Sequence, residues 1–187
     1  MESQTPPEAS QTEFSAGTSV IYAMHGKCQI LGTETRSLKG ESIRFYKLEM
    51  KKSSLSRSHQ ETAIWVPVIH AKNRGLRTPM SREEAEMAMK ILLSKEYFFN
   101  TSDAWSVTQP KLEATIRLEG GLGLAKVASF LYVLKKKQVV ASLEVTKLQE
   151  TVYKLLFREL SEALGKHMCV LEEQVNRAFR TKLTREN

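Results

Sequence analysis

The sequence is poor in cysteine and in long apolar runs. Its two cysteines, Cys28 and Cys169, are too few for a disulfide framework, so each is expected to be a reduced, half-buried thiol. The apolar stretches are short and interrupted, which excludes a segment able to span a bilayer. With 187 residues, 41% of them hydrophobic and 26% charged, the chain has the composition of a globular protein with one domain or two small ones.

The N-terminus lacks the features of a secretory signal. MESQTPPEASQTE is polar and acidic and contains two prolines, without the basic start and apolar run that a signal peptide needs. We therefore expect residues 1–13 to be a disordered tail. The protein is expected to be cytoplasmic and monomeric, without membrane association.

Residues able to carry catalysis or hold a metal are also scarce. A metal set of His25, Cys28, His167 and Cys169 would need two pairs from different halves of the chain, and no CxxC is present. The stretch GGLGLAKV only superficially resembles a phosphate loop, because Val127 stands where a magnesium-binding hydroxyl would follow the lysine. The sequence therefore predicts neither an enzyme nor a metal or other cofactor.

Positive charge is present in excess and is concentrated in the first half. The net charge is +7, and residues 14–78 carry eleven Lys and Arg against four Asp and Glu. A basic surface of this size suits an anionic partner, either nucleic acid or an acidic protein face.

The first half has the patterns of short β-strands. β-rich runs at residues 19–24 and 27–34 are separated by His25-Gly26, and Lys39-Gly40 marks a hairpin turn. In RFYKLEM, one face carries Phe45 and Lys47, and the other carries Tyr46, Leu48 and Met50.

A further strand is expected within residues 62–70, where Pro67 favours a sheet edge or a strand end. Four or five short strands within about 60 residues predict a small antiparallel barrel of the Tudor or SH3 kind over residues 14–78.

Residues 79–187 have the period of helices instead. Ser81 and Glu84 form the sequence signature of a capping box. Pro110 fits the first turn of a second helix, Gly120-Gly121 ends it, and Gly165 stops a fourth helix that Ser142 can cap. The apolar stripes expected to be buried are Ala85, Met89, Leu92 and Leu93, then Leu148, Val152, Leu155, Leu156 and Leu160, then Val170, Leu171, Val175 and Phe179. The fold class is therefore α+β, with a Tudor/SH3-like barrel followed by an all-helical domain of about five helices.

Both tryptophans leave alternatives open. Trp65 alternates within a strand and suits either a core or an exposed contact surface. Trp105 stands in a polar stretch between helices, where it is either a lid on the helical core or an exposed wedge that stacks against a base step. The run Lys135-Lys136-Lys137 either complements the C-terminal dipole of a helix or contacts phosphate.

The stretch FSAGTSVIYAMHGKCQILGTETRSLKG resembles the opening of the CarD/CdnL family of bacterial transcription factors. The similarity continues through FYKLEM, VPV at 66–68, GLR at 75–77 and the tryptophan after the first helix, to LLFRELSEAL at 155–164. Each piece is weak alone, but their order and spacing are specific over about residues 14–165.

The resemblance implies a Tudor-like module that binds the β subunit of RNA polymerase, and helices that contact promoter DNA at the upstream edge of the transcription bubble. A tryptophan placed like Trp105 is pushed into the minor groove there and slows collapse of the open complex. The residues implied in polymerase binding are Arg36, Lys39, Trp65 and Pro67. Those implied in DNA binding are Trp105, Lys111, Arg117, Lys126 and Lys135.

The sequence departs from the family pattern next to the tryptophan. Basic residues often follow it in the family, whereas Ser106, Val107, Thr108 and Gln109 follow it here. DNA affinity without polymerase is therefore expected to be weak and salt-dependent. The alternative function is a protein-interaction module that binds polymerase or another partner with little DNA contact, like the related module of the transcription-repair coupling helicase.

Overall fold

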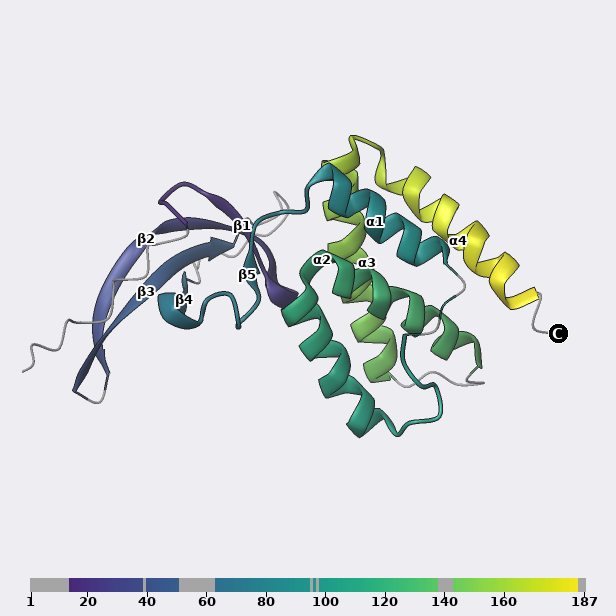
Figure 1. The fold of residues 1–187 in the computed structure, drawn as a ribbon, viewed down its shortest axis with the longest axis horizontal. Helices are drawn as coiled ribbons and strands as arrows, with labels where there is room; N and C mark the ends of the chain where they lie inside the picture. The colour runs from purple at the N-terminus through teal and green to yellow at the C-terminus, as the bar shows by residue number, and fades with distance from the viewer. Residues whose placement is uncertain are drawn as a thin grey trace, which may run out of the picture.

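A computed structural model describes residues 14–38, 40–50, 63–94, 96, 98–137 and 143–184 of the chain. Within these ranges a five-stranded antiparallel sheet is followed by four α-helices (Figure 1). The strands are β1 (Ser19–Tyr22), β2 (Gly26–Leu38), β3 (Glu41–Met50), β4 (Ala63–Pro67) and β5 (Leu76–Arg77), in the sheet order β4-β3-β2-β1-β5. Short 3-10 helices, η1 (Ala23–His25) and η2 (Val68–His70), follow β1 and β4. The α+β class is confirmed.

The strands form where side chains alternate between a buried and an open face. The predicted alternation is seen in β3, where Tyr46 and Leu48 are buried and Phe45 and Lys47 lie half-buried on the other face. The core on the buried face is made by Phe14, Val20, Cys28, Ile30, Tyr46, Leu48, Val66, Ala71 and Leu76. The hairpin prediction is also supported, because β2 and β3 pair as far as Leu38 and Glu41.

The predicted closed barrel is wrong, because the sheet stays open. β4 and β5 are its two edges, and no pairing joins them in the described part of the chain. β5 has two residues, and the chain reaches Pro79 two residues after it, where a proline has no N–H to donate to a strand ladder. Pro67 does end an edge strand, as predicted.

The helices are α1 (Arg82–Leu93), α2 (Trp105–Lys137), α3 (Leu143–Leu164) and α4 (Met168–Thr184). The capping box of α1 is confirmed, since the Ser81 hydroxyl accepts from the Glu84 N–H at 3.1 Å and the Glu84 carboxylate accepts from the Ser81 N–H at 2.9 Å. α3 ends where Gly165 was predicted to stop it, whereas Ser142 lies outside the described residues. No helix in the described ranges is both long and apolar enough to cross a membrane.

The prediction of about five helices is wrong by one, because two of them are joined in α2. α2 begins at Trp105, passes through Pro110 and bends at Gly120, which has φ 60° and ψ −125°. A residue with a Cβ rarely adopts this conformation, so glycine lets the helix turn sharply and continue. The two limbs form a V whose vertex points toward the sheet (Figure 1).

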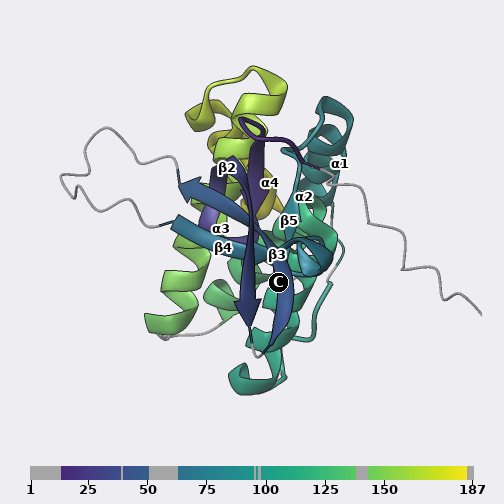
Figure 2. The same cartoon turned by 90° about the vertical axis from the view of Figure 1, so that its left-hand side faces the viewer.

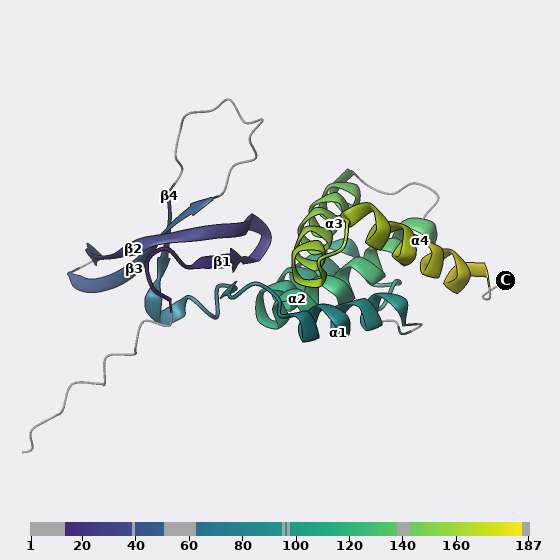
Figure 3. The same ribbon diagram turned by 90° about the horizontal axis from the view of Figure 1, so that it is seen from above.

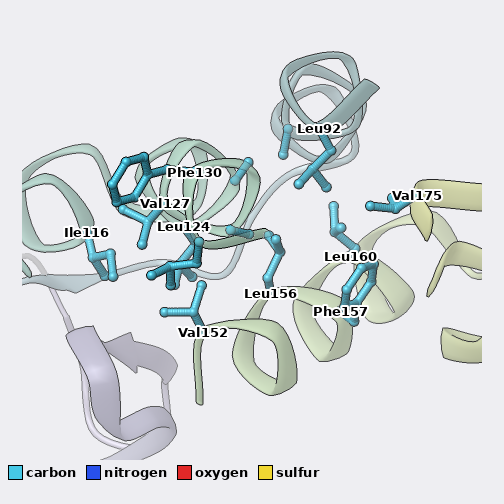
Figure 4. Close-up of a cluster of buried hydrophobic side chains, with 14 of the residues drawn as sticks. Leu92, Ile116, Leu124, Val127, Phe130, Val152, Leu156, Phe157, Leu160 and Val175 are labelled. Atoms are coloured by element: carbon cyan, nitrogen blue, oxygen red, sulfur yellow. The ribbon is translucent and has the colours of Figure 1, made fainter. Parts of the chain in front are cut away.

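One apolar core holds the helices together (Figure 4). Val152, Leu156 and Leu160 of α3 are fully buried, as their spacing predicts. They meet Leu124 and Val127 of α2, Leu92 of α1 and Val175 of α4. Four members of the predicted stripes are instead exposed or only half-buried: Leu93, Leu148, Leu155 and Val170.

The sheet and the helices lie side by side and meet over a small junction (Figure 3). Seen from the sheet end, the helices lie behind the strands (Figure 2). The tip between β1 and β2 contacts α2 and α3, with Met24 of η1 packed against the helical core. Lys27 forms an ion pair with Glu162 of α3 at 2.5 Å, and both side chains remain partly exposed.

A buried ion pair fastens the other side of the junction. The Arg77 guanidinium donates to both carboxylate oxygens of Glu159, at 2.5 and 2.8 Å, and the Met80 N–H donates to the same carboxylate at 2.8 Å. The Glu159 side chain is 6% exposed and that of Arg77 is 22% exposed. The kink in α2 leaves space for this arginine, because a Cβ on Gly120 would lie 2.7 Å from Arg77 Cδ.

Glu159→Gln should lower the free energy of unfolding by about 3 kcal/mol, because it leaves the Arg77 guanidinium partly buried without a counter-charge. The matched control is Glu162→Gln, which breaks the more exposed pair with Lys27 and should cost about 1 kcal/mol or less. Chemical denaturation of both variants measures the difference. Equal losses would contradict a special role for the Arg77–Glu159 pair.

Candidate functional site

The side of the sheet opposite its core carries a basic and aromatic surface, which we call the outer face. Its strands are in register so that Lys47 pairs with Trp65 and with Gly32, and Arg36 pairs with Ile43. The outer face therefore consists of Glu34, Arg36, Ile43, Phe45, Lys47, Trp65 and Pro67.

Trp65 is the centre of this face. The Arg36 guanidinium carbon lies 3.5 Å from the centroid of the indole ring, and Lys47 Nζ lies 5.6 Å from it. Both distances are within the range of a cation–π interaction. Arg36 also pairs with Glu34 at 3.6 Å, and its side chain remains 42% exposed. Trp65 is thus half-buried under an arginine, and Val66 beside it occupies the core.

The residues proposed for DNA contact lie along α2 and do not form one cluster. Lys111 Nζ is 3.2 Å from Asp103, in the loop before α2, and Lys126 Nζ is 2.6 Å from Glu119, beside the kink. Arg117 and Lys135 are exposed, and neither has an ion pair in the described part of the chain. The carboxylates next to Lys111 and Lys126 partly neutralise the two lysines.

Trp105 does not stand in a linker, and of the two alternatives the structure has the one in which the indole packs on the helical core. It is the first residue of α2, where the Ala104 carbonyl accepts from the N–H groups of Val107 and Thr108, both at 3.0 Å. The indole is half-buried and packs against the helical core. Its Nε1–H is buried, and no acceptor for it lies among the described residues. An unpaired buried donor costs stability, so this position is not optimised for packing alone.

Neither cysteine is placed for chemistry with a metal. Cys28 is buried in the core of the sheet, and burial raises the pKa of its thiol to about 11, which keeps it protonated. Cys169, expected to be half-buried, is exposed at the start of α4. In the described ranges, no three residues of the types His, Cys, Asp and Glu lie close enough to hold a metal ion.

The model of a known family matches residues 14–78, from Phe14 in the sheet core to the residue after β5. It is the model of the CarD-like/TRCF RID domain. After this match we call residues 14–78 the RID domain. The resemblance found in the sequence is thereby confirmed for this part of the chain. No match was found among curated proteins.

The RID domain contains the sheet, the complete outer face and Arg77, and it ends before the helices. Three of the four residues predicted for polymerase binding, Arg36, Trp65 and Pro67, therefore share one surface of this domain. The fourth, Lys39, lies outside the described residues. The five predicted DNA-binding residues all lie beyond the matched segment, so their role stays a prediction.

Phe45 and Lys47 belong to the outer face but were not among the residues predicted for polymerase binding. Their alternation with Tyr46 and Leu48 already placed them on one side of a strand. The missing information was the register of β3 against β4, which sets Lys47 opposite Trp65 and Phe45 opposite Pro67. Register depends on pairing between segments distant in sequence, which a single strand pattern does not define.

Trp105→Ala should lower the free energy of unfolding by about 2–3 kcal/mol, less than the roughly 3–5 kcal/mol of a fully buried aromatic, because the indole is half-buried. Trp105→Phe is the matched control. It keeps a ring on the core and removes an N–H whose burial without a partner costs about 1–3 kcal/mol, so it should stay near the wild type. Thermal and chemical melts compare the two variants, and equally large losses would contradict an unpaired N–H.

Proposed function

We propose that the protein is a transcription regulator that binds the β subunit of RNA polymerase through the outer face of its RID domain. The observation that carries the proposal is the match of residues 14–78 to the RID model. The same segment contains the contact between Arg36 and Trp65. RNA polymerase is the partner from which this class of domain takes its name, and the resemblance to the CarD/CdnL family implies the β subunit. The role is non-catalytic.

The outer face has the chemistry of a protein contact. The Arg36 guanidinium lies over the Trp65 ring and stays partly exposed, so it can donate to carboxylates of a partner. Stacking also holds the side chain in place, so less rotamer entropy is lost on binding. Phe45 and Pro67 add half-buried apolar surface between the charges. An acidic partner surface with an apolar centre would complement this face.

The second part of the proposal is that the helices contact promoter DNA and stabilise the open complex, with Trp105 as the aromatic contact. The support is the placement of Trp105 at the exposed start of α2, with an N–H that its packing leaves unpaired. To stack on a base the indole has to leave the helical core. The unpaired N–H makes the packed position of the indole less stable. Less free energy is therefore needed to move the indole out of the helical core.

Binding to DNA without polymerase is expected to be weak. Lys111 and Lys126 already have carboxylate partners, so they release few counterions on meeting phosphate. The same observation favours the second candidate function, a module that binds polymerase with little DNA contact. The two functions differ in whether the helices change the lifetime of the open complex.

Arg36→Glu should weaken binding of the full-length protein to RNA polymerase by tenfold or more, about 1.4 kcal/mol, because it removes the cation and places a carboxylate beside Glu34. Arg44→Glu is the matched control. Arg44 is an exposed cation of β3 on the other side of the sheet from Arg36, and the same charge reversal there should change affinity little. Isothermal titration against the β subunit measures both. Equal weakening would mean that net charge, and not the outer face, governs binding.

Trp105→Ala should shorten the lifetime of the open promoter complex by roughly five-fold to a hundred-fold, because an aromatic contact with a base contributes about 1–3 kcal/mol. Trp105→Phe should retain most of the lifetime. Val152→Ala controls for lost stability, since Val152 is fully buried in the helical core and reaches no surface. Lifetimes are measured after competitor challenge at a temperature where all variants are folded. If Trp105→Ala matches Val152→Ala, the second candidate function is correct.

A further inference from the structure

The turn that leads from η2 into β5 lies directly against α2. A Cβ built on Gly75 would lie 3.3 Å from Arg117 Cγ and 3.4 Å from Arg117 Cα. The backbone of the RID domain therefore touches the helix at the residue where Arg117 emerges. Lys72 and Arg74 in the turn and Arg117 on α2 are all exposed, and together we call them the junction patch.

The turn is held in a defined conformation. The Arg74 N–H donates to the His70 carbonyl at 2.9 Å, the Leu76 N–H donates to the Ala71 carbonyl at 3.0 Å, and Ala71 is buried in the sheet core. Gly75 has φ +84°, and a Cβ there would also lie 3.0 Å from that of Ala23, so only glycine fits this close approach. The positions from which the cations project are thus fixed before any partner binds.

The charges of the junction patch are not neutralised within the described part of the chain. Lys72, Arg74 and Arg117 have no ion pair there, unlike Lys111 and Lys126. Residues 63–82 contain no Asp or Glu at all.

The carboxylates of α2 nearest to Arg117 in sequence already have partners. Glu113 accepts from the Gln109 amide at 3.0 Å, and Glu119 pairs with Lys126. The Gln109 amide is neutral, so Glu113 keeps its charge four residues before Arg117, whereas the three cations of the junction patch have no ion pair in the described ranges and remain available to an anion.

We propose that the junction patch binds backbone phosphates of promoter DNA, so that the RID domain itself contributes to the DNA contact. This inference rests on the proposed function, because it extends the DNA-contacting surface from α2 into the turn. Phosphate is favoured over a protein partner because Lys72, Asn73 and Arg74 are three consecutive donors without an apolar side chain among them. Protein interfaces are depleted of lysine and are centred on aromatic and apolar groups, as the outer face is.

The proposal gives a quantitative expectation for salt dependence. Each phosphate contact adds about 0.9 to the slope of log affinity against log salt concentration. The double variant Lys72→Gln/Arg74→Gln removes two cations without altering Gly75 or Ala71. It should lower the slope by about two, and adding Arg117→Gln should lower it by about one more.

The experiment uses the full-length protein, RNA polymerase holoenzyme and a fork-junction promoter DNA. Affinity for holoenzyme with and without DNA is measured across a series of salt concentrations. The matched control is Arg44→Gln/Lys90→Gln. It removes two exposed cations that have no ion pair in the described ranges. Arg44 is near the start of β3, and Lys90 is near the end of α1 that lies away from the sheet.

The expected result is a lower salt slope for the junction variant only in the presence of DNA, with affinity for holoenzyme alone unchanged. A wild-type slope in the junction variant, or an equal drop in the control, would overturn the inference while leaving the proposed function intact. Equal weakening without DNA would assign the patch to a protein partner and would also overturn it. If the wild type itself gains no affinity from DNA, the DNA part of the proposed function fails, and that outcome is visible before any variant is compared.

Discussion

The ion pair between Arg77 and Glu159 is the constraint on which the arrangement of the whole molecule depends. It joins the last residue of β5 to α3, and the Glu159 carboxylate also accepts from the N–H of Met80, two residues before α1 begins. The bend of α2 at Gly120 leaves the arginine room to reach the carboxylate. A straight α2 with a side chain at that position would fill the same space.

The same ion pair connects the two surfaces to which functions are proposed. The outer face belongs to the sheet. Trp105 is the first residue of α2, and this helix begins at a point away from the sheet (Figure 1). Because the junction fastens the two parts through Arg77, Lys27 and Met24, the orientation of α2 relative to the outer face is set by the protein. A polymerase bound at the outer face would therefore determine where the helices point. Local concentration at the promoter could then replace intrinsic DNA affinity.

The features predictable from the sequence were those that local physics defines. The Ser81–Glu84 capping box depends on four consecutive residues, and the alternation of Tyr46 and Leu48 depends on the pleat of one strand. The buried stripe of α3 follows equally from its own period. The resemblance of residues 14–78 to a known family was also visible, because its glycines and apolar residues occur in a specific order.

The features that sequence reasoning missed depend on contacts between distant segments. Gly120-Gly121 correctly marked an interruption, but whether a helix ends or bends there depends on Arg77 lying beside it. The predicted closed barrel was wrong. β5 ends after two residues, Pro79 follows shortly after it, and the chain turns toward Glu159. Trp105 was placed in a linker because its polar neighbours hid the helix start. Its packing against the helical core comes from tertiary structure that no local pattern records.

The separation of Arg77 and Glu159 in the chain has a consequence for how the protein is made. They lie 82 residues apart, so at about 5–20 residues per second the ribosome needs roughly 4–16 seconds after adding the arginine to reach its carboxylate. All residues of the five strands have been synthesised when this interval begins. The residues of the outer face are thus synthesised before α3, which holds the carboxylate that fixes the sheet against the helices.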